Sequence, residues 1–164
     1  MNPIDVSTLS PHDQIRQVAA RYSRGVDRLD LATMQSAYWP DAIDDHGVYV
    51  GDAMAFCERV VTSHARFEST MHCVMNHWID VVDDTTAHGE VYNVTYLRSI
   101  VDGEPVLDTW WGRYADRYEC RDGEWRIIHR VCVHEGTERR AVTTTMPIDA
   151  ARFRQGHEDR GPVA

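Results

Sequence analysis

His72 is the natural candidate for acid–base chemistry in this sequence. It follows Ser69, where the hydrophobic pattern changes from a period of 3.6 to the period of 2 that is typical of strands. Imidazole titrates near neutral pH, so a His that faces a ligand can act as a general base. Alternation puts His72, Val74 and Asn76 on one face of the predicted strand. A His among apolar neighbours is also a common core residue, and both interpretations stay open on the pattern alone.

A second candidate, Asp27, lies near the end of a predicted N-terminal helix that also carries Tyr22. The apolar stripe of this helix begins at Ile15. At about 100° per residue, Asp27 falls on the flank of the stripe and not at its centre. Its carboxylate can therefore belong to a pocket, or it can be solvated just before the helix ends.

The tripeptide Asp44-Asp45-His46 concentrates ionisable groups in a predicted short strand, residues 43–50. Alternation puts Asp44 and His46 on one face and Asp45 on the other. Such groups are costly inside a core unless they are paired. The motif therefore indicates either a paired polar site or an exposed edge strand that is protected by its charges.

Arg130 lies in the last predicted strand and shares a face with Ile128 and Cys132. An Arg on the apolar side of a strand needs an acid or an anionic ligand. His72 and His77 fall on opposite faces of their strand unless a bulge intervenes, and no helical His-Glu-x-x-His pattern occurs. We therefore expect no metal site.

The composition excludes several classes of function. The chain has 164 residues and a formal net charge of −9, and all 17 basic residues are Arg. Without Lys there is no Schiff-base or pyridoxal phosphate anchor and no Walker lysine. An acidic chain without a basic run is poorly suited to nucleic acids or anionic membranes. Neither a Gly-x-Ser-x-Gly elbow nor a dinucleotide-binding Gly-x-Gly-x-x-Gly is present.

The cysteines and the N-terminus favour a cytoplasmic protein. Cys57, Cys73, Cys120 and Cys132 are widely spaced and form neither a metal pattern nor a disulfide framework. The first ten residues lack the basic start and apolar stretch of a signal peptide, and no apolar run approaches the length of a membrane span. We expect reduced thiols, most of them buried as small apolar side chains.

These candidates must be positioned by a fold in which helices come first and strands second. Helical spacing covers residues 11–29, 31–38 and 51–66, and the strands predicted after Ser69 are residues 70–82, 86–101, 106–120 and 124–134. Turn-forming residues separate these strands, which predicts an antiparallel meander. Such long strands curl around the helices in an α+β fold and leave a concave mouth for a small molecule. Trp111 and the other strand aromatics can line that pocket or simply pack the core.

Five segments in this order resemble the SnoaL-like branch of the nuclear transport factor 2-like superfamily, over about residues 10–135. They are 22–27 (Tyr-Ser-Arg-Gly-Val-Asp), 38–42 (Tyr-Trp-Pro-Asp-Ala), 44–47 (Asp-Asp-His-Gly), 69–72 (Ser-Thr-Met-His) and 118–130 (Tyr-Glu-Cys-Arg-Asp-Gly-Glu-Trp-Arg-Ile-Ile-His-Arg). The resemblance implies a cone-shaped α+β barrel, with N-terminal helices packed in a strongly curved, mostly antiparallel mixed sheet.

Within the superfamily the chain is most similar to the scytalone dehydratase and hexachlorocyclohexane dehydrochlorinase group. That resemblance implies three catalytic residues: His72 as base, Asp27 as its partner and Arg130 as a strand cation. The lysine that the dehydrochlorinase uses has no counterpart here. The implied function is a cofactor-independent lyase of the dehydratase type. Arg130 or His46 would stabilise the departing group.

The implied substrate is a small apolar molecule, cyclic or polycyclic. We expect Tyr22, Asp44, His46, Asn76 and Trp111 in its pocket. The alternatives are an isomerase of the same fold and a non-catalytic ligand-binding or assembly subunit, since a fold alone does not select a reaction.

The predicted organisation is an N-terminal arm at residues 1–9, a SnoaL-like domain at 10–135 and a polar C-terminal extension at 136–164 that contains a short helix near 149–155. The open outer face of such a sheet favours a homo-oligomer, either a dimer or a trimer.

Overall fold

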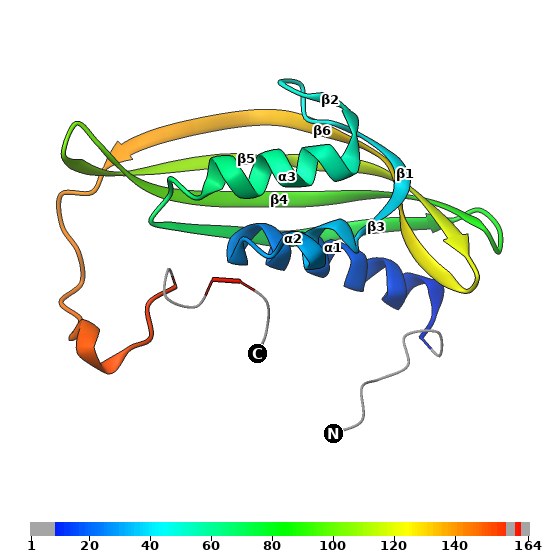
Figure 1. The fold of residues 1–164 in the computed structure, drawn as a ribbon, viewed down its shortest axis with the longest axis horizontal. Helices are drawn as coiled ribbons and strands as arrows, with labels where there is room; N and C mark the ends of the chain where they lie inside the picture. Colours follow the sequence, from blue (N-terminus) through cyan, green and yellow to red (C-terminus); the bar gives the residue numbers. More distant parts are fainter. Residues whose placement is uncertain (1–8, 157–159, 162–164) are drawn as a thin grey trace.

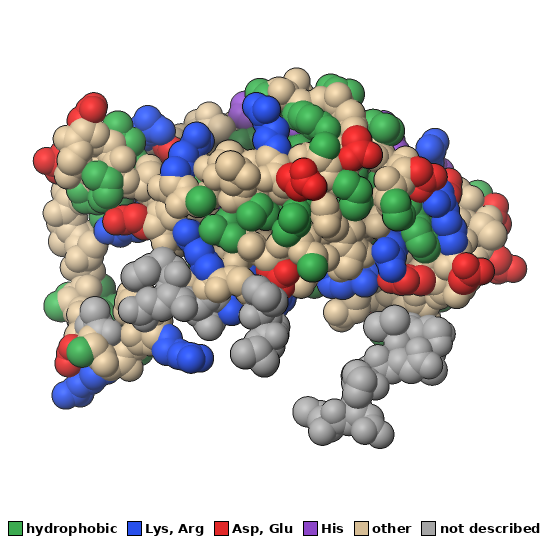
Figure 2. Space-filling model, viewed as in Figure 1, with side chains coloured by type: hydrophobic (Ala, Val, Ile, Leu, Met, Phe, Trp, Pro, Cys, Tyr) green, Lys and Arg blue, Asp and Glu red, His purple; other side chains and the backbone are tan. Residues whose placement is uncertain are grey.

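Three helices lie against one face of a long, curved sheet in the computed structural model (Figure 1). The structure describes residues 9–156, 160 and 161, so most of the predicted N-terminal arm lies outside the described residues. The elements are α1 (Pro11–Arg28), α2 (Leu31–Gln35), β1 (Tyr38–Asp45), β2 (Val50–Asp52), α3 (Ala53–His64), β3 (Ser69–Val81), β4 (Thr86–Val101), β5 (Glu104–Arg121), β6 (Glu124–Ala141) and the 3-10 helix η2 (Ala150–Arg152). Acidic and basic side chains are interspersed over the side of the molecule shown in Figure 2.

The sheet is mixed, with the strand order β2-β1-β6-β5-β4-β3. Neighbouring strands are antiparallel, except that β1 runs parallel to β6. The long strands β3 to β6 arch over the helices, which pack into the concave side (Figure 1). The α+β cone predicted from the sequence is confirmed.

α1 is the helix that positions the candidate residues from the N-terminal segment. The Ser10 side chain accepts a hydrogen bond from the Asp13 amide and caps its start, and Leu29 ends it in the left-handed conformation. Its buried face includes Ile15 and Tyr22. Gly25 lets α2 cross closely, because a Cβ there would lie 2.5 Å from the backbone nitrogen of Met34.

The structure corrects the predicted boundaries between residues 31 and 52. α2 ends at Gln35 and not at Tyr38, and β1 begins at Tyr38 and runs through Pro40. The pairing of β1 with β6 shifts register between Tyr38 and Ile43, and proline is tolerated at such irregularities. The predicted strand 43–50 is instead a hairpin of β1 and β2, with His46 and Gly47 in its turn.

The last strand is longer than predicted. β6 runs to Ala141 because residues 136–141 continue its pairing with β5, opposite Trp111 to Val106. These residues, assigned from their polarity to the C-terminal extension, therefore belong to the sheet. The short helix expected near 149–155 is the single turn η2.

Candidate active site

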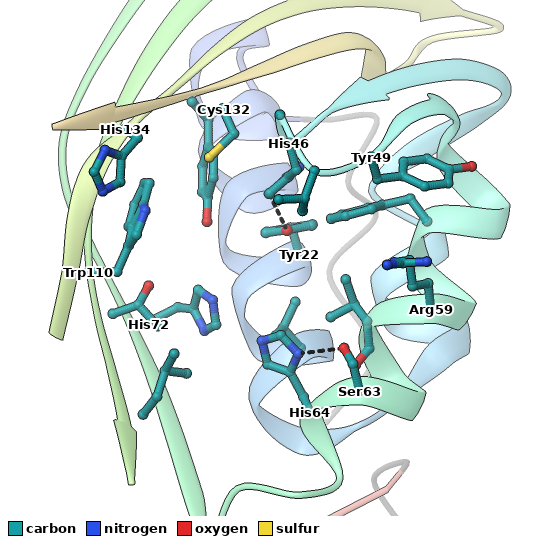
Figure 3. A pocket seen from close by; sticks show the side chains of 18 residues that line it. Tyr22, His46, Tyr49, Arg59, Ser63, His64, His72, Trp110, Cys132 and His134 are labelled. Atoms are coloured by element: carbon teal, nitrogen blue, oxygen red, sulfur yellow. Dashed lines mark hydrogen bonds between the residues drawn. The ribbon is translucent and has the colours of Figure 1, made fainter. Parts of the chain in front are cut away.

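A cavity of about 540 Å³ lies between the concave face of the sheet and the helices α1 and α3 (Figure 3). Its wall is made mainly of aromatic, aliphatic and His side chains. The lining residues are Tyr22, Val26, His46, Gly47, Val48, Tyr49, Phe56, Arg59, Val60, Ser63, His64, His72, Thr95, Leu97, Trp110, Tyr114, Cys132 and His134. Its volume falls within the range of small-molecule sites.

His72 and Asp27 are in direct contact, although they are 45 positions apart in the chain. The His72 ring Nδ1 lies 2.6 Å from one carboxylate oxygen of Asp27, and the His72 backbone N–H donates to the other oxygen at 2.9 Å. An ionised carboxylate only accepts, so Nδ1 carries a proton and neutral His72 has a free lone pair on Nε2. His72 lines the cavity, whereas Asp27 lines a shallow hollow outside it.

A second His–Asp pair faces the same cavity. The carboxylate of Asp44 is fully buried and hydrogen-bonds the His46 ring Nδ1, and the Tyr38 hydroxyl donates to its other oxygen at 2.6 Å. The His46 ring stacks on Phe56 at 4.2 Å, and its Nε2 lies 3.5 Å from the Tyr22 hydroxyl (Figure 3). Asp44 itself does not line the cavity, contrary to the prediction, because it lies behind His46.

Arg130 is fully buried and does not line the cavity either. Its guanidinium makes a two-point ion pair with Asp116, with both distances 2.7 Å. It lies 4.3 Å from the ring centre of Tyr22 and 4.1 Å from that of Tyr114. These rings line the cavity in its place. The expected contact of Arg130 with substrate is therefore wrong.

Burial raises the pKa values of the Tyr22, Tyr38 and Tyr114 hydroxyls above the usual value for tyrosine, although the charge of Arg130 opposes the shift. These phenols keep their protons throughout the ordinary pH range, and the Tyr38 hydroxyl donates its proton to Asp44. The cluster therefore holds Arg130 as a cation without forming a tyrosinate.

Asn76 and Trp111 were predicted to line the pocket and do not. The register of β3 against β4 shifts between Val74 and His77, so Asn76 lies in an irregular stretch and is exposed. Trp111 lies on the outer face of β5, and its neighbour Trp110 faces the cavity. The same shift turns His77 inward, so its Nε2 lies 3.4 Å from the Tyr118 hydroxyl.

Several residues at the cavity were not predicted, among them His64, His134 and Arg59 in its wall and Asn93 behind the wall. His64, on the last turn of α3, lies with its ring centre 6.4 Å from that of His72. Burial lowers the His64 pKa to about 4, so its imidazole is neutral at pH 7. His134 also lines the cavity. Asn93 is buried behind the wall and donates to Thr95 and Tyr114 at 2.9 and 3.1 Å. The four-residue spacing of Phe56, Val60 and His64 places them on one face of α3, and this pattern could have indicated that His64 lines the cavity.

Within the described residues, no group of three or more His, Cys, Asp and Glu side chains is arranged to hold a metal ion. No described helix is long and apolar enough to cross a membrane.

Comparison with known proteins shows the family to which the chain belongs. Residues 7–131 match the model of the SnoaL-like domain, and no curated protein sequence matches significantly. The chain therefore belongs to the SnoaL-like domain family.

Solved structures share the fold at low sequence identity. A type 2 hexachlorocyclohexane dehydrochlorinase (LinA) is 18% identical, with a TM-score of 0.74 over 88% of this chain and 99% of its own. A putative scytalone dehydratase from Novosphingobium aromaticivorans is 19% identical, with a TM-score of 0.70 over 87% of this chain and 96% of its own. The LinA-type3 dehydrochlorinase from Novosphingobium barchaimii is 21% identical, with a TM-score of 0.69 over 88% of this chain and 99% of its own. At these identities the likeness shows the fold alone.

Proposed function

We propose that this protein is a cofactor-independent lyase that removes water from a cyclic β-hydroxy carbonyl compound bound in the cavity. The observation that carries this proposal is the contact between His72 and Asp27 at the cavity wall. The dehydratase and dehydrochlorinase names of the similar structures fit this class of reaction.

In the proposed reaction His72 Nε2 removes the proton next to the carbonyl group. Asp27 holds the ring in the tautomer that leaves Nε2 free, and it stabilises the imidazolium that forms. General base catalysis of this kind typically contributes about 10²–10⁴ in rate. The apolar wall strengthens these electrostatic interactions by excluding water.

The leaving hydroxyl needs a proton, and we assign its donor as His46. Arg130 has no access to the cavity, whereas His46 lines it and contacts Asp44 through Nδ1, so that Nε2 is the ring nitrogen left for a substrate. The bond between the β-carbon and the hydroxyl oxygen breaks as that oxygen takes the proton from Nε2 of His46. The C–H electron pair becomes the new double bond, and water leaves.

At the end of the cycle His72 carries the extra proton and His46 has lost one, so exchange with solvent restores both. Asp27 lies at a hollow on the outer side of His72, which gives this pair a contact with solvent. A halide can leave without a proton, so a dedicated donor favours dehydration over dehydrohalogenation.

The positions of His72 and His46 on one cavity also support a second candidate function, the isomerisation of a double bond. His72 would remove a proton from one carbon, and His46 would deliver one to another. The isomerase and dehydratase reactions share the first step, so a measurement of proton abstraction by His72 tests both candidate functions.

The experiment follows proton abstraction directly. Cyclic β-hydroxy ketones, beginning with 3-hydroxycyclohexanone, are incubated with the protein in D₂O, and proton NMR records α-proton exchange and enone formation. We expect His72→Gln to abolish both exchange and enone formation, and His46→Gln to abolish enone formation while exchange persists. Exchange at the wild-type rate in His72→Gln would refute the mechanism. Isomerisation of the corresponding β,γ-enone without dehydration would identify the second function.

A further inference from the structure

We propose that the cavity binds cyclic carboxylates, with the apolar ring system inside it and the carboxylate held at its mouth by Arg59. This inference names a substrate class for the proposed function and rests on the same pocket. Its evidence is a charged side chain on the inner face of α3, which the proposed reaction does not use.

Arg59 occupies the stripe of α3 that faces the cavity. The lining residues of this helix are Phe56, Arg59, Val60, Ser63 and His64, which follow the spacing of a single helix face. On the same helix, Glu58 and Thr62 lie outside this stripe and are exposed. Figure 3 shows Arg59 on the α3 side of the pocket, between Tyr49 and Ser63.

Within the described part of the chain, Arg59 forms no hydrogen bond and no ion pair, whereas Arg130 is paired with Asp116 through two short contacts. The cavity lining contains no Asp or Glu, so Arg59 is its one permanently charged side chain within the described part of the chain. The carboxylates of Asp27 and Asp44 are engaged by His72 and His46.

This combination specifies the chemistry of a ligand. The planar guanidinium fork matches a carboxylate in a two-point contact. Its exposed position keeps the desolvation cost of the pair low. The aromatic wall, which includes Phe56 and Trp110, suits a ring system, and about 540 Å³ accommodates two or three fused rings.

The test uses two fluorescent probes of nearly the same shape, anthracene-2-carboxylate and anthracene-2-carboxamide. Both are titrated into the full chain at low and moderate ionic strength. We expect Arg59→Gln to raise the dissociation constant of the carboxylate about tenfold and that of the amide by less than about twofold, because only the carboxylate loses a charged hydrogen-bond partner. The affinity of wild-type protein for the carboxylate should fall as salt is added.

Two further variants fix the interpretation. Arg117→Gln removes the same charge from an exposed site that lines a hollow away from the cavity, and it should leave both constants unchanged. Leu97→Trp fills the cavity and should weaken both probes, which locates them there.

The proposal is overturned if the wild-type protein binds neither probe, if Arg59→Gln weakens both equally, or if Arg117→Gln matches it. If the carboxylate probe binds through Arg59 but the protein turns over none of the cyclic β-hydroxy ketones, the result supports this inference and counts against the lyase. The two proposals therefore fail separately.

Discussion

Asp27 accepts two hydrogen bonds from a single residue, His72, one from the backbone N–H and one from the ring. The first ties the C-terminal half of α1 to the start of β3, and the second orients the imidazole. Backbone and side chain are thus fixed by the same carboxylate, so the direction of Nε2 depends on how the helix docks on the strand.

Replacing Asp27 should therefore impair the proposed chemistry more than the fold. We expect Asp27→Asn to lower turnover about 10²–10⁴-fold, because an amide cannot stabilise the imidazolium and can favour the wrong tautomer. The unfolding free energy should fall by about 1–2 kcal/mol, measured by urea denaturation.

The double variant Asp27→Asn/His72→Gln should be little worse in turnover than the worse single variant, since the two residues act as a unit. Multiplicative losses in turnover would show two independent roles.

The pairing of Arg130 with Asp116 gives a prediction about stability. Both side chains have no solvent exposure, so removing one leaves an uncompensated buried charge. Asp116→Leu or Arg130→Met alone should cost about 3–5 kcal/mol of unfolding free energy in urea titrations.

The paired change Arg130→Met/Asp116→Leu should cost less than the sum of the two separate changes, because neither charge then remains buried. Strict additivity would contradict the coupling. Arg139→Met, at a more exposed ion pair with Asp108, is the control and should cost no more than about 1 kcal/mol.

The outer face of the sheet supports the proposed homo-oligomer. Large apolar side chains on β3, β4 and β5 are exposed there: Met71, Met75, Trp78, Tyr92, Tyr96 and Trp111. Contiguous exposed apolar surface of this kind is typical of protein interfaces.

We expect light scattering coupled to gel filtration to show a dimer or trimer, and Met71→Glu/Trp78→Glu to shift it to monomer. The control Ile148→Glu places the same charge on an exposed residue of the C-terminal segment and should not change the mass. A monomeric wild-type protein at micromolar concentration would contradict the proposal.

The sequence predicted the fold because the order of helices and strands and the change of hydrophobic period are local properties. It could not predict which side chains line the cavity. Strict alternation placed Asn76 beside His72, but an extra residue in β3 between Val74 and His77 breaks that alternation, and neither glycine nor proline marks the position. Alternation also shows that Trp110 and Trp111 lie on opposite faces of β5, but it does not show which of the two faces the cavity.

Arg130 shows the same limit for charges. The sequence indicated that it needs an acid or an anionic ligand, and the structure supplies the acid, because Asp116 is its cross-strand partner in β5. That pairing depends on a register shift between Arg117 and Tyr118, which turn residues alone do not specify. A buried acid and a bound anionic ligand can both neutralise a buried Arg, so only the register of β5 against β6 distinguishes the two.

The buried histidines give the last prediction, on pH. Burial lowers the pKa of His64 and of His77 to about 4. The folded state therefore disfavours their protonation, while the unfolded chain takes up protons near pH 6.5. Because the unfolded state binds more protons between these values, stability must fall as the pH decreases from about 6.5 toward 4, by at most about 1.4 kcal/mol per pH unit for each His.

Urea titrations at pH 7, 6 and 5 measure this slope. His64→Gln and His77→Gln should each flatten it, whereas His88→Gln, at an exposed position of β4, should leave it unchanged. Equal unfolding free energies at pH 7 and pH 5 in the wild-type protein would mean that water reaches both rings and that burial does not hold the imidazoles of His64 and His77 neutral.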